Sequence, residues 1–185
     1  MIIKTGRFGS LEIGEQEIIR VPLGILGFPE CKNFCLVDPG DDTLILWLQS
    51  LENPDLAMPV LEPKIFKTDY AVRLSAAELR ELELENVNQS AVFSILTIGA
   101  DIAEMTGNLR APLVINLKKQ IARQVVLQEN EYSLRHPMFK ELRMHLMTIS
   151  SQKKTAADES AAELRGAIRI SDIPPSLTVR SLAGL

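Results

Sequence analysis

The sequence predicts a mainly β protein: a small barrel-like or rolled antiparallel sheet with one short helix, followed by a C-terminal helical or disordered extension. Short apolar runs separated by turn-forming residues recur over most of the first 127 positions. A complete helix-start signal occurs in a single segment of that region. The composition changes after Pro137, so we expect a β domain over 1–137 and an extension over 138–185.

The first half of the chain supplies strand-length apolar runs bounded by Gly, Pro, Asn and Asp. The strands expected in this half are 18–22, 34–38, 43–50, 56–63 and 70–74. The last of them alternates between apolar and polar residues and is therefore expected to be half-buried. A nearly continuous apolar run at 91–99 predicts a central strand that is covered on both faces.

One helix and one hairpin follow from local signals. Ser75 and Glu78 stand three residues apart before an apolar-periodic segment, which predicts a capped helix. The runs 112–117 and 121–127 flank a three-residue basic loop and predict two strands joined by a tight turn. Asn116 interrupts the first of these runs. We interpret its amide as satisfying backbone groups near the turn, with direct contact to a partner as the alternative.

The extension has three parts. Apolar residues at helical spacing predict a helix over 138–149. Residues 150–166 are polar, small and charged, which is typical of a linker. The remaining residues, 167–185, contain a Pro-Pro pair and too few apolar side chains to form a core, so we expect disorder or a short docking segment.

The charge distribution favours protein partners over nucleic acid. The formal net charge is -4, and residues 1–139 hold 13 Lys and Arg against 19 Asp and Glu. Contacts to phosphate need Lys or Arg, so an acidic body opposes direct nucleic-acid binding and suits a basic protein. No apolar stretch approaches the length of a membrane span, and the start lacks the pattern of a signal peptide. We expect a cytoplasmic monomer without membrane association.

No residue set predicts catalysis, a metal or a cofactor. Cys31 and Cys35 with His136 and His145 would supply four zinc ligands, but their spacing fits no standard zinc motif. We interpret the cysteines as free thiols that share one strand face in the core, and His136 as a hydrogen-bonded structural residue. No nucleophile stands with a matching base, so we expect no enzyme.

Four separated segments resemble the flagellar assembly factor FliW family. They are FGSLEIGEQEIIRVPLGILGFPECKNFCLVD, LWLQSLENPDLAMPVLEP, MTGNLRAPLVINLKKQIARQVVL and YSLRHP. They occur in the family's order and span about residues 1–137. Two departures stand out. Gly107 replaces a common Ala, and the chain continues for 48 residues past Pro137, where most members end. The extension is thus a candidate cover for a surface that other members leave open.

The resemblance implies a non-catalytic β-barrel-like protein that binds flagellin in the cytoplasm through a groove for apolar helical termini. It also implies binding of the carbon storage regulator CsrA, a small dimeric RNA-binding protein that represses flagellin translation. Export of flagellin would then free the protein to capture CsrA, which makes it a partner switch based on differential binding. The alternative is a flagellin-specific secretion chaperone without a translational role. A direct RNA-binding barrel is disfavoured because aromatics are few.

The resemblance also suggests partner-contacting residues in the motif loops. These candidates are Phe28, Pro29, Trp47, Gln49, Asn108 and Arg135. For Trp47 a buried position in the core is the competing interpretation. Gly24 and Gly27 are interpreted as backbone-conformation positions rather than as contacts.

The predicted helix adds a second set of candidates. Glu78, Glu81 and Glu83, with Glu85, form either a solvated helix face or an acidic patch that captures CsrA. If the patch is functional, reversing Glu81 and Glu83 to Lys should weaken CsrA binding.

Overall fold

The computed structural model describes residues 1–40, 44–128, 131–144, 147 and 178–180. The predicted linker at 150–166 and His145 lie outside these residues. The strands are β1 (Ile2–Thr5), β2 (Gly9–Glu12), β3 (Ile19–Arg20), β4 (Asn33–Asp38), β5 (Leu46–Ser50), β6 (Ala57–Leu61), β7 (Ala91–Thr97), β8 (Thr106–Gly107), β9 (Leu113–Asn116), β10 (Ile121–Gln124), β11 (His136–Pro137) and β12 (Thr178–Arg180). The helix α1 spans Ala76–Glu81, and four 3-10 turns cover Glu15–Glu17, Pro63–Ile65, Val87–Gln89 and Ile102–Glu104.

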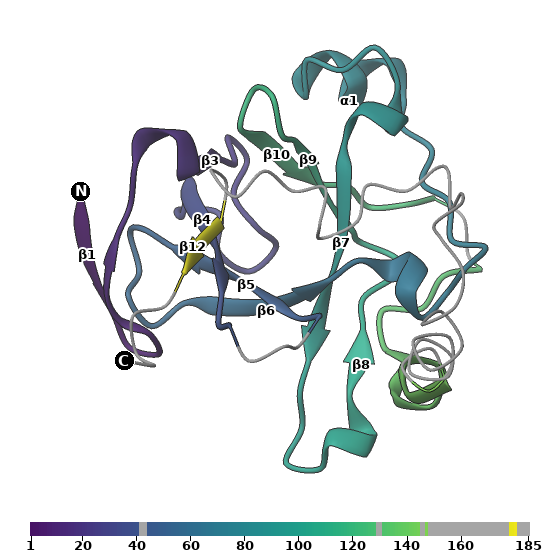
Figure 1. The fold of residues 1–185 in the computed structure, drawn as a ribbon. Coiled ribbons are helices and arrows are strands. Elements are labelled where there is room, and N and C mark those ends of the chain that lie inside the picture. The colour runs from purple at the N-terminus through teal and green to yellow at the C-terminus, as the bar shows by residue number, and fades with distance from the viewer. Residues whose placement is uncertain (41–43, 129–130, 145–146, 148–177, 181–185) are drawn as a thin grey trace, which may run out of the picture.

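Seven strands close into a barrel, which confirms the predicted fold class (Figure 1). Their order around the barrel is β3, β4, β5, β6, β7, β9 and β10, with β10 returning to β3. The closing pair is parallel and has a single register pair, Ile121 with Arg20, whereas the other six pairs are antiparallel. Closure leaves the barrel strands few exposed edges.

The barrel interior is filled by apolar side chains that alternate with outward-facing ones. Large interior residues include Ile19, Phe34, Leu36, Leu46, Leu48, Phe93, Leu113 and Ile115. On β4 the alternate residues Cys35 and Val37 point outward, and the β1–β2 hairpin covers them with Phe8, Leu11 and Ile13. This hairpin was not predicted, because MIIKTGRFGSLE carries Gly and charged residues and lacks a long apolar run.

A second apolar cluster lies outside the barrel, against the other face of β7 and β9. α1 supports it through Leu82 and Leu79, and the chain after β11 contributes Met138 and Leu142. Ser75 accepts a hydrogen bond from the Glu78 N–H, and Glu78 caps back onto Ser75, so the predicted capping box is confirmed. Residues 139–144 are helical within the predicted 138–149 segment.

Two local predictions are wrong. Residues 71–74 keep an alternating burial pattern but pair with no described strand, and their inward side chains, Val72 and Leu74, pack against the second apolar cluster instead. Cys31 and Cys35 do not share a face. Cys31 precedes β4 and packs into the barrel interior, whereas Cys35 points outward under the β1–β2 hairpin.

Candidate functional site

An open pocket surrounds Trp47 on the outside of the barrel. Trp47 is half-buried, so the interpretation as a buried core residue is wrong. Phe8 meets its ring edge-on, with centroids 5.9 Å apart and an interplanar angle of 70°. The pocket is lined by Gly6, Arg7, Phe8, Pro39, Ile45, Trp47 and Ile98. The lining combines aromatic and aliphatic side chains with one cation and exposed polar atoms, a mixture typical of a surface that receives a segment of another protein.

The one cation in that lining is Arg7, which lies over the indole ring. Its guanidinium carbon is 3.6 Å from the Trp47 centroid and 5.9 Å from that of Phe8. A guanidinium stacked on Trp is held by cation–π attraction and keeps its N–H donors available. Trp and Arg are also the residues most often found to dominate binding energy at interfaces. The pair therefore combines an apolar platform with directional donors.

The loop between β3 and β4 presents a second apolar surface. Leu23 and Leu26 are each 60% exposed, and Pro29 is exposed, whereas Phe28 is half-buried against the barrel core. Gly24 has φ +71°, and a β-carbon there would lie 2.7 Å from the Phe28 carbonyl oxygen. Phe28 thus anchors the loop, and Pro29 is the member of the predicted pair that a partner can reach.

Gln49 is fully buried and organises the loop after β5. Its amide Nε2 lies within hydrogen-bond distance of four backbone carbonyl oxygens, those of Ser50, Asn53, Pro54 and Leu56. Contact with a partner would require this loop to open. We therefore leave Gln49 out of the surface proposed below.

The glutamates around α1 are largely used within the chain. Glu78 belongs to the capping box, Glu81 pairs with Arg123, and Glu83 Oε2 lies 3.5 Å from Lys119 Nζ. Glu85 accepts a hydrogen bond from Gln89. The basic β9–β10 hairpin therefore offsets much of the acidic patch that the sequence predicted.

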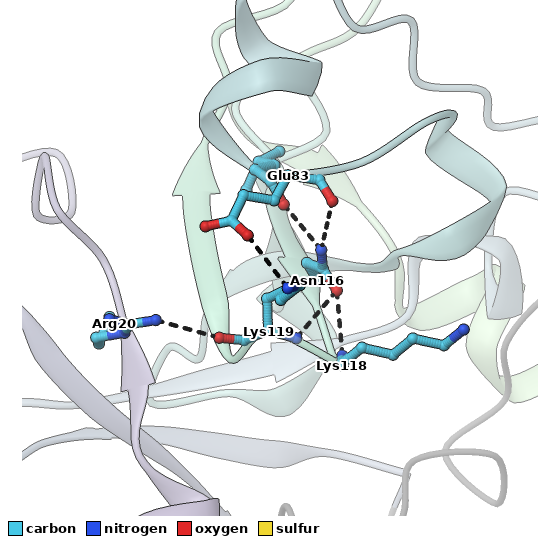
Figure 2. Close-up of polar contacts among 6 residues, drawn as sticks. Arg20, Glu83, Asn116, Lys118 and Lys119 are labelled. Carbon is cyan, nitrogen blue, oxygen red and sulfur yellow. Dashed lines mark hydrogen bonds and ion pairs between the residues drawn. The ribbon is translucent and has the colours of Figure 1, made fainter.

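Asn116 joins that hairpin to the end of α1, and its predicted structural role is confirmed (Figure 2). Its Nδ2 donates to the carbonyl oxygens of Leu82, at 2.9 Å, and Glu83, at 3.0 Å. Its Oδ1 accepts from the backbone N–H groups of Lys118 and Lys119. The last carbonyls of a helix lack partners within the helix, and here a buried amide supplies them. The lysines at the turn are placed by this amide.

The remaining candidates lie near β8 and β11. The Oδ1 of half-buried Asn108 accepts from the Ala111 N–H at 2.9 Å, so the residue shapes its own turn. Arg135 is exposed. Figure 1 shows α1 and β8 at opposite ends of β7, with β1 and β5 to one side. The structure therefore does not gather the predicted residues into one site.

Cys31, Cys35 and His136 are packed within the fold. No group of three or more His, Cys, Asp or Glu among them could hold a metal ion. Burial, with a smaller effect from Glu17, raises the pKa of the Cys35 thiol to about 12, so it stays protonated and a poor ligand. His136 stacks on Phe66 at 6.0 Å, but its buried Nε2 has no hydrogen-bond partner there, so the predicted hydrogen bond is absent at that atom. None of the described helices could cross a membrane.

Sequence reasoning missed Arg7, Phe8 and Ile98 as partners of Trp47. They come from the β1–β2 turn and the end of β7, about ninety positions apart, and meet only because the hairpin folds across β4 and β5. A local signal existed for Arg7 and Phe8 alone: a cation–aromatic pair next to Gly6 and Gly9, where a tight turn exposes side chains.

Comparison with known proteins identifies the family. The family model for FliW protein matches residues 2–138. The chain is 40% identical to the flagellar assembly factor FliW of Bdellovibrio bacteriovorus over 80% of this chain and 84% of that protein. It is 37% identical to that of Caldanaerobacter subterraneus, over 77% of this chain and 96% of the relative.

A solved structure agrees with these sequence matches. The crystal structure of the flagellar assembly factor FliW superposes with a TM-score of 0.71 at 34% identity, covering 75% of this chain and 97% of the other. The shared part is the barrel with its hairpin and α1, and the segment after 138 lies beyond the family match. The chain belongs to the FliW family of flagellar assembly factors.

Proposed function

We propose that this protein is a cytoplasmic partner switch that binds flagellin and, once flagellin has been exported, binds CsrA and relieves repression of flagellin translation. It works by binding as a monomer, without catalysis, a cofactor or direct contact with RNA. The observation that carries the proposal is the open Trp47 pocket on the barrel of a FliW family member. An apolar helix end of unpolymerised flagellin suits such a pocket, because apolar anchors facing one side of a helix fill a groove.

Binding measured by titration calorimetry tests the proposal. Purified protein is titrated with flagellin, with CsrA, and with CsrA after saturation by flagellin. The switch requires binding in the first two titrations and a strong loss in the third. Binding of flagellin without CsrA would instead support the secretion chaperone, and binding of neither would contradict both functions.

Trp47→Ala is expected to weaken flagellin binding about thirtyfold, which corresponds to about 2 kcal/mol for an aromatic anchor at the centre of an interface. Loss of the indole also removes the platform under the Arg7 guanidinium. Leu134→Ala is the control, because Leu134 is 59% exposed beside β11 and outside the pocket lining. An equal loss in both variants would contradict assignment of flagellin to the Trp47 pocket.

The acidic residues near α1 are proposed to contribute to CsrA capture through the exposed parts of Glu81 and Glu83. Their side chains remain 51% and 53% exposed despite their ion pairs. Reversing both to Lys should weaken CsrA binding and flatten its dependence on salt. The matched control reverses the exposed Glu12 and Glu30, which changes net charge equally. If both double variants bind CsrA with the same affinity, the loss comes from the change in net charge and not from Glu81 and Glu83.

A further inference from the structure

The edge of β4 is incompletely covered by the barrel. On one side β4 pairs with β5 over four residues, from Phe34 to Val37. On the other side β3 pairs only with Asn33 and Phe34. β3 is this short because the 3-10 turn Glu15–Glu17 takes the preceding chain out of the sheet. Barrel closure therefore leaves the second edge of Leu36–Asp38 without a neighbour from the family domain.

The C-terminal segment fills that edge. β12 pairs in parallel with Leu36–Asp38, with Thr178 opposite Leu36, Val179 opposite Val37 and Arg180 opposite Asp38 (Figure 1). β12 also lies against β2, so the hairpin and the tail flank the same part of β4. The strand comes from outside residues 2–138, the part that matches the family.

We propose that the β4 edge over Leu36–Asp38 is a docking site for an extended peptide strand, which this chain's own residues 178–180 occupy in cis. Addition of a strand to an exposed edge gains main-chain hydrogen bonds without requiring a preformed pocket. An uncovered edge is also a template for unwanted pairing, and covering it is a common protective device. Docking of the tail does not depend on the proposed binding of flagellin or CsrA.

The shortness of β12 makes the docking reversible. Three residues in parallel pairing form few ladder bonds, and each net hydrogen bond stabilises only weakly. Attachment to the same chain compensates by making the association intramolecular. A free strand of similar sequence should therefore be excluded while the tail is docked and admitted when the tail is released.

The docking site adjoins the Trp47 pocket. In the register of the sheet, Val179 is opposite Val37, and Val37 is opposite Trp47 on β5. β4 then leads directly into Pro39, which lines that pocket. Only β4 thus separates a strand docked on its edge from β5, the strand that carries Trp47.

The test uses the full chain with Thr178→Pro and Val179→Pro combined. Alternate residues of a parallel strand bond to a given neighbour, so one of these prolines removes a ladder donor whichever way β12 faces. The control carries Ala183→Pro and Gly184→Pro, beyond the bounds of β12. Hydrogen exchange of those amides of Leu36–Asp38 that face β12 is expected to rise at least tenfold in the test variant only, while the alternate amides of β4 that face β5 keep their protection.

A second measurement asks whether the vacated edge accepts a strand. A fluorescent peptide of residues 176–185, SLTVRSLAGL, should bind the test variant at least tenfold more tightly than the wild type or the control. Unchanged exchange, or equal peptide binding by all three proteins, would overturn the proposal. A wild-type dimer that the two prolines at 178 and 179 abolish would show exchange of tails between copies and would overturn docking in cis.

Discussion

Gly24→Ala should destabilise the protein by about 3 kcal/mol or more, the sum of backbone strain and a steric clash. Gly24 has φ +71°, a conformation that costs Ala more than Gly. A β-carbon at this position would lie 2.7 Å from both the Phe28 carbonyl oxygen and the Pro29 Cα. These are backbone atoms, so relief requires moving the loop and lifting Phe28 away from the barrel core.

Gly27→Ala is the matched control in the same loop. Gly27 also has positive φ, at +91°, but a β-carbon there would meet nothing within 4 Å. It should therefore cost only about 1 kcal/mol, the strain contribution alone. Urea unfolding, followed by the fluorescence of Trp47, the single tryptophan of the chain, measures both variants. Equal losses of stability in the two variants would show that the nearby backbone of Phe28 and Pro29 is not the reason why Ala is disfavoured at position 24.

Gly24 and Gly27 shape the exposed loop between β3 and β4. Both glycines were interpreted from the sequence as backbone positions, and the structure gives both a positive φ. The sequence did not indicate that one is packed and the other open, because that difference depends on how closely the loop folds onto itself. The consequence is functional, since Gly24 holds the loop in the shape that leaves Leu23, Leu26 and Pro29 exposed.

The sequence predicted those elements that depend on residues close together in the chain. The capping box of Ser75 and Glu78 and the hairpin after Asn116 each depend on residues fewer than five positions apart. The segment 70–74 had the alternation of a strand but found no neighbour, since pairing is a tertiary property. The parallel closure through Ile121 and Arg20 also had no sequence signal, because a single register pair has no pattern.

The candidate site also contains one residue that the sequence identified and others that only the fold brings to it. Trp47 was identified through the family resemblance, and its exposure follows from its outward position between Leu46 and Leu48, which point into the barrel. Its neighbours were not predicted, because Arg7 lies in the β1–β2 turn and Ile98 follows β7, and only the fold brings these distant segments to Trp47. Conversely, Gln49 stood beside Trp47 in the same motif, and its burial became evident only with the loop that it supports. Shared motif membership therefore does not imply shared exposure.

Asn116→Ala should lower the free energy of unfolding by about 2–4 kcal/mol, because a buried hydrogen-bonding group is removed and its partners are left unsatisfied. Asn116 is 4% exposed and serves two carbonyls and two N–H groups at once. The Leu82 carbonyl at the end of α1 loses the partner that Asn116 provided, and the 118–120 turn loses the acceptor that bridges it.

Asn116→Asp tests the donor role of this side chain separately from its acceptor role. A carboxylate keeps the acceptor for the Lys118 and Lys119 N–H groups but turns the Nδ2 donor into an oxygen that faces two carbonyl oxygens. We expect Asp to be at least as destabilising as Ala at neutral pH, and less so in acid, where the protonated carboxyl can donate again. Asn88→Ala, at an exposed asparagine, should change stability by less than about 0.5 kcal/mol. If Asn116→Asp matched the wild type at neutral pH, the turn alone would need this side chain and its bonds to α1 would contribute nothing.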